Sequence, residues 1–325
     1  MQGKETSEQE TLHCTVGIDV SKSWLDAHVL PVDESLRVAN TLDGIRKLKR
    51  WLLACNPKLV AVEATGKWHR GLCRSLHASQ IAVAVTDPYR VRMFAKAQGI
   101  LAKTDRLDAR VLARFAAVMA PAARPPAPQA LDALKEMVAA QDSAVAERAA
   151  LKNQLAAAES AFLKRQLTGR IKQLSVHIAG IRRETLKRIK ADEGLAGRYA
   201  ILTSIPSFGP IVAETLIACL AELGTVNDKQ AGALAGLAPV ADDSGQRHGV
   251  RSIWGGRAIV RKILYLAAVS ARRCNADMRI FYERLIAHGK APKVALIAVA
   301  RKLLILANTL IAQNRTWLPT PPKYA

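Results

Sequence analysis

The feature that most constrains this chain is a proline-rich segment near its middle. Residues 121–128, PAARPPAP, contain four prolines, and no further proline occurs before Pro206. Because proline lacks the backbone donor that helices and sheets need, neither structure continues through this segment. The pattern also changes there, from alternating strands and helices to helices alone. We predict a disordered tail over residues 1–11, an α/β domain over 12–124, a helical coiled-coil arm over 125–198 and a mainly α domain over 199–325.

The first predicted domain alternates apolar runs with helical periodicity. Strands are predicted at LHCTVGIDV, WLDAHVL, LVAVEAT and IAVAVTD. Helices are predicted over residues 42–54, 68–78, 88–98 and 105–119. Near-continuous apolar runs such as IAVAV are typical of central strands that are covered on both faces. The sequence therefore predicts an α/β fold with buried central strands.

The region after the proline segment is rich in strong helix formers. Two series of residues step by three and four as in a heptad seam: Leu131, Leu134, Val138, Gln141 and Val145, then Leu167, Ile171, Leu174, Ile178 and Ile181. The simplest structure is an antiparallel hairpin that turns near residues 157–169. It serves either as a spacer within one chain or as a dimerisation arm, and both interpretations stay open.

Beyond Pro206 the pattern predicts shorter helices, over residues 210–223, 228–237, 257–274 and 292–314. A loop rich in Asp, Ser, Gly, Arg and His is predicted over residues 238–256. The last domain is therefore expected to be mainly α.

The charge balance limits the partners. The chain has 48 Lys and Arg against 27 Asp and Glu, a net charge of +21. Such an excess indicates a polyanionic partner, and DNA or RNA is the natural one. A membrane is the competing surface, but we expect no membrane span because the apolar stretches are short or interrupted, as residues 201–220 are by Pro206, Pro210 and Glu214.

The cysteines and the N-terminus indicate a compartment. Five cysteines without a CxxC pair argue against a disulfide framework and a zinc ribbon. The start of the chain, MQGKETSEQE, lacks the basic and apolar regions of a secretory signal. We therefore expect a cytoplasmic protein that can reach a genome.

Four acids stand where metal-dependent chemistry needs them. Asp19 and Glu63 end two predicted strands, and strand-end carboxylates can converge at one rim of a sheet. Asp105 and Asp108 are three residues apart at the start of a predicted helix, so they share one face. Hard oxygen ligands suit Mg²⁺, which can assist phosphodiester transfer. The alternative is that Asp105 and Asp108 only interact with the helix dipole behind Thr104.

These segments resemble a known family. GIDVSKSWLDAHV, VEATGKWHRGL and VTDPYRVRMFAKAQGILAKTDRLDARVLARFA are similar to the RuvC-like, ribonuclease-H-fold DEDD domain of the insertion sequence 110/1111 transposases. The resemblance implies that Asp19, Glu63, Asp105 and Asp108 form the D-E-D-D set and bind Mg²⁺.

The last domain carries a similar signal. ALAGLAPVADDSGQRHGVRSIWGGRAIVRKILYLAAVSA resembles the C-terminal domain of the same family, in which a serine followed by glycine is catalytic. The resemblance implies that Ser244 is this serine, with Ser252 as its nearest rival; on sequence alone Ser244 is an ordinary turn residue. Candidate nucleic-acid contacts follow it: Arg247, Arg251, Arg257, Arg261 and Lys262.

Two details of this domain stay open. Asp242 and Asp243 precede the serine, where they would either repel phosphate or bind metal. The run IPSFGP resembles a helix-hairpin-helix turn, but Ser207 stands where many such turns have glycine. It is either a phosphate contact or a packing turn.

The resemblance covers residues 16–317 and implies more than spacing can show. It implies recombination of donor and target DNA through a phosphoserine intermediate, directed by a structured noncoding guide RNA. It also implies a homo-oligomer, a dimer or tetramer, in which the acids of one subunit meet the serine of another, in a bacterial cytoplasm at the nucleoid. The alternatives are a RuvC-like nuclease or junction resolvase that does not rejoin DNA, and a non-catalytic nucleic-acid-binding protein.

Overall fold

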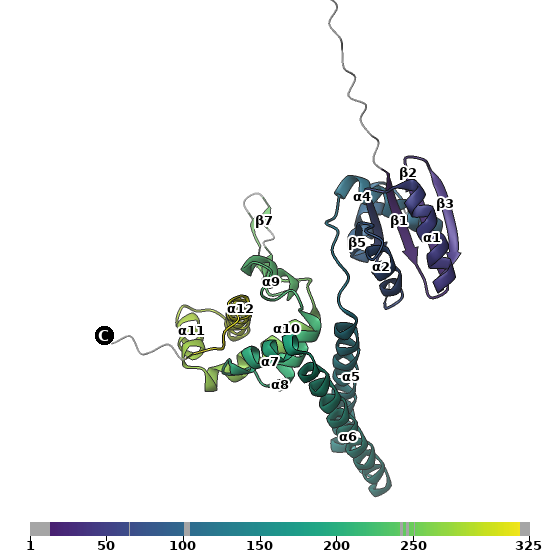
Figure 1. The fold of residues 1–325 in the computed structure, drawn as a ribbon. Helices are drawn as coiled ribbons and strands as arrows, with labels where there is room; N and C mark the ends of the chain where they lie inside the picture. Colours follow the sequence, from purple (N-terminus) through teal and green to yellow (C-terminus); the bar gives the residue numbers. More distant parts are fainter. Residues whose placement is uncertain are drawn as a thin grey trace, which may run out of the picture. The chain divides into compact units, whose positions relative to one another are not determined.

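The computed structural model describes residues 14–64, 66–100, 105–240, 243–244, 247–249 and 251–318, and the side chains at positions 105–107 and 247–248 lie outside this description. The predicted tail, residues 1–11, lies outside it too. The chain forms two compact units, Met1–Ala127 and Pro128–Ala325, which divide within the proline-rich segment (Figure 1).

The first unit is built on a five-stranded mixed sheet. Its strands have the order β3-β2-β1-β4-β5, in which β2 is antiparallel to its neighbours and β1, β4 and β5 are parallel. They are β1 (Thr15–Val20), β2 (Trp24–Leu30), β3 (Glu34–Ala39), β4 (Leu59–Glu63) and β5 (Val83–Thr86). A mixed sheet of this order, flanked by helices, fits the ribonuclease-H-like fold.

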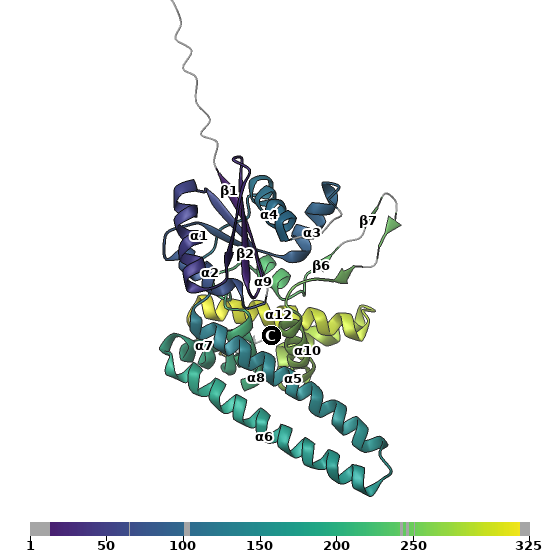
Figure 2. The same cartoon turned by 90° about the vertical axis from the view of Figure 1, so that its right-hand side faces the viewer.

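Helices cover both faces of this sheet, as Figure 2 shows. One face packs on α1 (Leu42–Cys55) and α2 (His69–His77), the other on α3 (Pro88–Ala97) and α4 (Asp105–Met119). The even-numbered residues of β1, such as Ile18, belong to the first core, whereas Leu59 and Ala61 of β4 belong to the second. The α/β prediction is confirmed for this unit.

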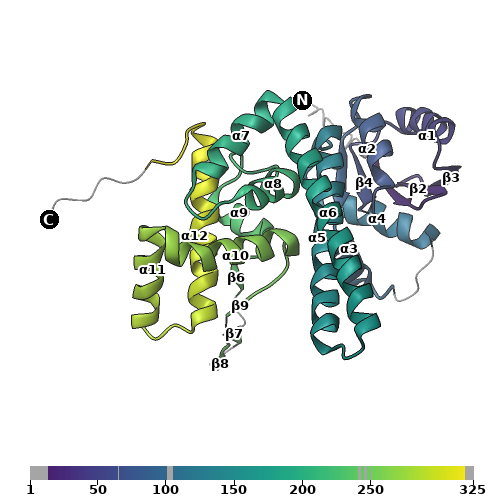
Figure 3. The same cartoon turned by 90° about the horizontal axis from the view of Figure 1, so that it is seen from below.

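The second unit begins with a helical arm. Helices α5 (Gln129–Ala157) and α6 (Ala161–Ala191) lie side by side as an antiparallel hairpin (Figure 3). The buried residues of the arm include Leu131, Leu134, Val138 and Gln141 of the predicted seam. At its base, Leu131, Leu134 and Ile189 share one core with the helices that follow. The arm and the C-terminal helices are therefore one compact unit.

Six further helices complete this unit: α7 (Glu193–Ser204), α8 (Pro210–Cys219), α9 (Asp228–Leu234), α10 (Ala258–Cys274), α11 (Ala276–Ala287) and α12 (Pro292–Ala312). The sequence pattern did not predict α11, which begins directly after α10 with Asn275 as its N-cap. It also did not predict the edge strand β3, in which half of the residues are exposed and half are polar.

The expectation that the apolar stretches are too short or too interrupted to span a membrane is wrong for α12 by length and composition. Among the described residues this helix alone is long and apolar enough by length and composition. However, Val299, Leu303 and Ala307 are fully buried in the core of the second unit. Helix α12 is a core helix, and its apolar composition is explained by that packing.

Residues 239–253 differ from the predicted polar loop. Two antiparallel pairs of short strands form there: β6 (Pro239–Val240) pairs with β9 (Ser252–Ile253), and β7 (Asp243–Ser244) pairs with β8 (Arg247–His248). The result is a narrow antiparallel hairpin that extends away from the helices of its unit (Figure 2). We call the four strands β6, β7, β8 and β9 the serine hairpin. Its strands are too short and polar for periodicity to reveal them.

Candidate active site

The first candidate acids stand at the carboxyl ends of two neighbouring parallel strands. The register of β1 and β4 pairs residues as far as Ile18 and Val62, and the next residues are Asp19 and Glu63. Both are half-buried. Because side chains alternate along a strand, Asp19 shares the face of Gly17, and Glu63 shares that of Ala61. This is the face that α3 and α4 cover, so both carboxylates are on the same side of the sheet.

A glycine brings α4 close to these acids. A Cβ atom on Gly17 would lie 2.2 Å from the carbonyl oxygen of Ala109 and from the backbone nitrogen of Ala113. Two residues earlier on β1, Thr15 Oγ1 donates to the carbonyl of Ala113 at 3.2 Å. Strand β1 and helix α4 therefore run in opposite directions where they touch. The end of β1 that carries Asp19 faces the first turns of α4, where Asp108 lies. Only glycine permits this approach.

The fourth acid can be placed only in part. The backbone of Asp105 begins α4, three residues before the half-buried Asp108, but its side chain lies outside the described part of the chain. Among the described residues, no group of three or more His, Cys, Asp and Glu could hold a metal ion. That search does not include Asp105. The strand register and the contact at Gly17 put Asp19, Glu63 and the start of α4 on one face of the sheet, but no group of three among the described acids could hold a metal ion, so a D-E-D-D metal site stays a prediction.

A further acid, absent from the sequence prediction, lies opposite Asp19. Asp26 pairs with Asp19 in the β1–β2 register, is buried, and has its Oδ1 3.5 Å from Nε of Arg37. Directly opposed residues of antiparallel strands have their Cβ atoms about 5 Å apart. In the strand sequence WLDAHVL, an acid stands at a position that the strand pattern predicts to be buried. This was the signal that could have identified Asp26.

A polar cluster fixes the first half of α4 to the sheet. Arg110 Nη2 lies 2.8 Å from Oδ1 of Asp33, His28 Nε2 lies 3.1 Å from the same oxygen, and His28 Nδ1 lies 2.9 Å from Ser35 Oγ. Burial lowers the pKa of His28, and the Asp33 charge opposes that effect only in part. Arg110 is two residues from Asp108, so this cluster holds the helix turn that carries the acid.

Cations and an exposed indole gather at the same rim. Lys22 and Lys67 place their Nζ atoms 5.9 and 5.4 Å from the ring centre of Trp68, which is 37% exposed. Asn40 Nδ2 donates to the carbonyl of Ser21 at 2.8 Å and to that of Trp68 at 3.4 Å. The loops after β1 and β4 are thereby joined beside Asp19 and Glu63. Exposed aromatic rings with cations are typical of nucleic-acid surfaces.

The serine predicted from the family resemblance is exposed in the serine hairpin. Ser244 is the last residue of β7 and pairs with Arg247. Asp243 Oδ1 accepts a hydrogen bond from the Gly249 nitrogen at 3.2 Å, and its Oδ2 lies 4.0 Å from Arg251. Asp243 therefore joins the two sides of the hairpin next to the serine.

The cations predicted to contact nucleic acid differ in the protein partners that they have, and Arg257 is the most firmly held. Arg257 donates to Glu222 Oε2 at 2.7 Å and to the Cys219 carbonyl at 2.8 Å. Although burial opposes it, the hydrogen bonds and charge of Arg257 hold the pKa of Glu222 below its usual value. Arg257 thus anchors the start of α10 within its own unit.

The other described cations on this surface also have protein partners. Arg261 donates to the Gly255 carbonyl at 2.6 Å, and Lys262 forms an ion pair with Asp142 of the arm at 2.5 Å. Arg251 is exposed beside Asp243, and the side chain of Arg247 lies outside the described residues. Of the five predicted contacts, Arg251 is the described cation with the most exposed setting.

The turn that resembles a helix-hairpin-helix has an unusual backbone. Ser207 has a φ of 89°, a left-handed conformation that favours glycine. Its position in the run therefore matches that of the glycine it replaces. Whether a phosphate approaches this turn stays a prediction.

Comparison with known proteins gives two family matches along the chain. Residues 16–160 match the DEDD family of IS110 elements, described as "Transposase", and residues 199–283 match "Transposase IS116/IS110/IS902 family". A "Pilin gene-inverting protein" of Moraxella bovis is 27% identical over 314 residues, which cover 92% of this chain and 96% of that protein.

Two further similarities cover parts of the chain. The "Insertion element IS116 uncharacterized 44.8 kDa protein" of Streptomyces clavuligerus is 30% identical over 145 residues, 43% of this chain and 35% of that protein. Among solved structures, "T. thermophilus RuvC in complex with Holliday junction substrate" matches 34% of this chain and 98% of that chain, with 18% identity and a TM-score of 0.27. On the two family matches, the chain belongs to the IS110 family of insertion-element transposases, which recombine DNA.

Proposed function

We propose that this transposase joins donor and target DNA through a phosphoserine intermediate, with Asp19, Glu63, Asp105 and Asp108 as Mg²⁺ ligands and Ser244 as nucleophile. The observation that carries the proposal is the rim of the first unit. There Asp19 and Glu63 end adjacent parallel strands, and the close contact at Gly17 brings the start of α4 to the same face.

The donor set fits a hard divalent cation, because carboxylate oxygens are the ligands that Mg²⁺ prefers. When bound, the metal supplies Lewis-acid stabilisation of the phosphoryl oxygens. The residues of the chain orient the DNA: Trp68 with Lys22 and Lys67 provides a surface for the strand beside the acids.

The covalent step follows from the chemistry of a serine. The Oγ–phosphorus bond of Ser244 forms while the bond from phosphorus to the leaving deoxyribose oxygen breaks. The serine proton passes to a base, and the leaving oxygen takes a proton. A hydroxyl group of the other DNA then attacks phosphorus, which joins the strands and restores the serine. The phosphodiester bond energy is conserved, so the step needs no further energy source.

The acids and the serine belong to different compact units. We propose a homo-oligomer, a dimer or tetramer, in which the acids of one subunit meet Ser244 of another. We also propose that a structured guide RNA from the noncoding end of the element selects the two DNAs. The net charge of +21 supports polyanionic partners of this kind.

Recombination of donor and target plasmids, with the flanking noncoding RNA supplied, tests the mechanism. We expect Ser244→Ala and Asp105→Ala each to abolish joints, and Ser252→Ala, the same change in the same hairpin, to retain them. Retained recombination in Ser244→Ala contradicts the serine mechanism. Loss of cleavage in Asp105→Ala but not in Ser244→Ala would instead establish a nuclease, and binding without any cleavage in Mg²⁺ a non-catalytic protein.

Mixing two inactive variants tests the assembly. If the acids and the serine act from different subunits, Asp19→Ala mixed with Ser244→Ala restores part of the recombination that each lacks alone. Full inactivity of the mixture, with mixed oligomers verified by two affinity tags, contradicts the proposed sharing. Omitting the noncoding RNA should abolish joints, and unchanged joints would contradict RNA guidance.

A further inference from the structure

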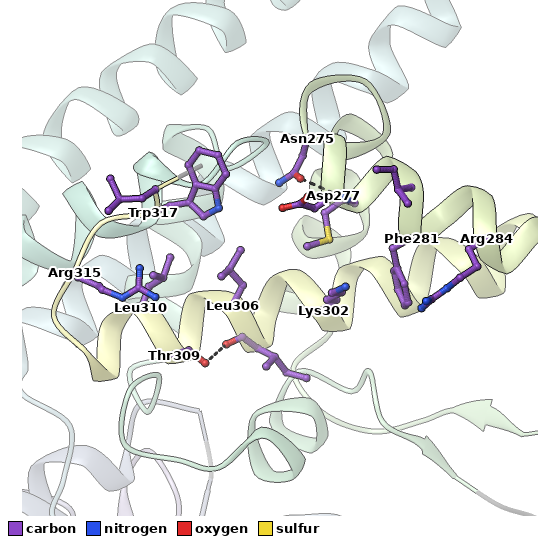
Figure 4. Close-up of a pocket in the computed structure, with 14 residues that line it drawn as sticks. Asn275, Asp277, Phe281, Arg284, Lys302, Leu306, Thr309, Leu310, Arg315 and Trp317 are labelled. Atoms are coloured by element: carbon purple, nitrogen blue, oxygen red, sulfur yellow. Dashed lines mark hydrogen bonds between the residues drawn. The ribbon is translucent and has the colours of Figure 1, made fainter. Parts of the chain in front are cut away.

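The second unit contains a pocket that the proposed recombination site does not include. It has a volume of about 610 Å³ and lies between α11, α12 and residues 315–318 (Figure 4). Lys302, Leu306 and Leu310 line it at four-residue steps along one face of α12, which corresponds to about 12 Å of helix. This volume falls within the range of pockets that enclose small organic ligands.

Aromatic rings and cations stand at both ends of this pocket. Figure 4 shows Trp317 and Arg315 at one end, and Phe281 with Arg284 at the other. Lys302 Nζ lies 4.5 Å, and Arg284 Cζ 5.4 Å, from the ring centre of Phe281. The described lining thus combines three cations with two aromatic side chains.

The positive charge of the pocket is open to a ligand. In the described part of the chain, Arg284, Lys302 and Arg315 have no carboxylate within ion-pair distance. Asp277 is the one acid among the described lining residues. By comparison, Arg257 and Lys262 of the same unit are each paired with an acid. An anion would therefore complete the pocket.

The walls are held in place by buried polar contacts. The backbone nitrogen of Trp317 donates to Ser204 Oγ at 2.8 Å. The buried Asn275 accepts from the Met278 nitrogen at 3.2 Å and donates to the Pro206 carbonyl at 3.4 Å. These contacts fix the Trp317 end of the pocket and the start of α11 before any ligand binds, which lowers the ordering cost of binding.

We propose that this pocket binds a nucleotide of a single-stranded nucleic acid. Its phosphate lies against Arg284, Lys302 or Arg315, and its base lies against the ring of Trp317 or Phe281. Stacking on aromatic side chains needs a base that is free of the duplex, which is why a single strand is the ligand. An acidic peptide would satisfy the cations but offers no base to stack on the rings.

Equilibrium binding of labelled oligonucleotides to the full chain, without divalent metal, tests the charges. The ligands are single-stranded DNA and single-stranded RNA of about 16 nucleotides, the upper end of common single-strand site sizes, and a duplex of the same sequence. We compare Arg284→Gln with Lys302→Gln in one variant against Arg279→Gln with Lys293→Gln in another. The control pair lies on the same two helices, is exposed, does not line the pocket and removes equal charge.

For the pocket pair we expect at least about 10-fold weaker single-strand binding, and a salt dependence that is shallower by about 0.7 for each phosphate that the variant no longer neutralises. The control pair should change Kd by less than about 3-fold. The strand, DNA or RNA, whose binding weakens more is identified as the natural ligand. An equal effect of the two pairs, or an equal weakening for the duplex, overturns the proposal because it indicates nonspecific attraction to phosphate.

A second variant tests stacking. Phe281→Leu keeps an apolar side chain but removes the ring, and Trp317→Leu does the same at the other end. At least one should weaken binding of the normal single strand by about 5-fold or more, and affect an abasic strand of equal length by less than about 2-fold. Thermal unfolding verifies that each variant is folded. Equal effects on both strands would overturn the assignment of a base to the pocket.

Discussion

The rim acids and the serine differ in how the fold supports them. Asp19 and Glu63 extend from strands whose residues Ile18 and Val62 are fully buried. Ser244 is exposed in a hairpin of two-residue strands. The rim is therefore prearranged by a core, whereas the hairpin can be repositioned by a partner or by DNA at little cost. The proposed mechanism uses both properties, a rigid site for the metal and a nucleophile that reaches different strands.

The largest expected effect is a loss of recombination, and we expect it to be similar for a substitution in either region. Asp19→Asn and Ser244→Ala should each lower recombination by at least about 1,000-fold, because each removes a group that acts on the phosphate. Neither should change the free energy of unfolding by more than about 1 kcal/mol. Recombination rates and urea unfolding of both variants check this. A loss of activity explained by unfolding would contradict the assigned roles.

The next prediction concerns the packing that supports the rim. Gly17→Ala should lower the stability of the first unit by about 2–4 kcal/mol and lower activity, because its Cβ would meet the backbone of α4 at 2.2 Å. Gly71→Ala, in α2 with nothing within 4 Å of its Cβ, should instead stabilise by about 0.5–1 kcal/mol. Urea unfolding measures both. A neutral Gly17→Ala would show that α4 is not fixed to the rim as described.

Glu214, a buried acid outside both regions, tests whether burial alone marks a functional carboxylate. Glu214 is 2% exposed, and burial raises its pKa to about 7 against the opposing charge of Arg182. Its folded-state pKa lies above the unfolded value, so its stabilising contribution is complete below about pH 4.5 and is lost as the pH rises through 7. Glu214→Gln should therefore stabilise the second unit by about 1–3 kcal/mol at pH 8 and by little at pH 4.5, as urea unfolding at the two pH values measures. Recombination should be retained; its loss would give Glu214 a functional role.

The smallest effect concerns Asp243. It joins the sides of the serine hairpin through Gly249 and Arg251, both exposed enough for solvent to compete. Asp243→Asn should change stability by less than about 0.5 kcal/mol and recombination by less than about 10-fold. Urea unfolding and the plasmid recombination assay measure the two effects. A loss as large as that of Ser244→Ala would instead favour a metal ligand at this position.

Much of the fold was predictable from local patterns. Helix α4 begins and ends at the predicted residues, and the buried positions of α5 follow the predicted seam at Leu131, Leu134 and Val138. Strand β3 and the serine hairpin were not predicted, because β3 mixes polar with apolar residues and the strands of the hairpin are only two residues long. Local periodicity carries no signal for such strands.

The site was predictable to a similar degree. The strand-end positions of Asp19 and Glu63 follow from the sequence, because strand ends can be recognised from the apolar run before them. The closeness of α4 depends on Gly17, and the position of Asp26 depends on the β1–β2 register. The approach of α4 is a tertiary relation that no short segment encodes, whereas the segment WLDAHVL does carry a signal for Asp26. Ser244 rests on family membership, since nothing local distinguishes it from Ser252.

The most direct test of the account is to map a covalent protein–DNA adduct. The full chain, with its RNA and a labelled substrate in Mg²⁺, is denatured during the reaction, digested and analysed by mass spectrometry. We predict a phosphodeoxynucleotide on the peptide that contains Ser244, present in wild type and Ser252→Ala and absent in Ser244→Ala and Asp19→Asn. Recombinant joints without any adduct on that peptide, or an adduct that persists in Ser244→Ala, would contradict it.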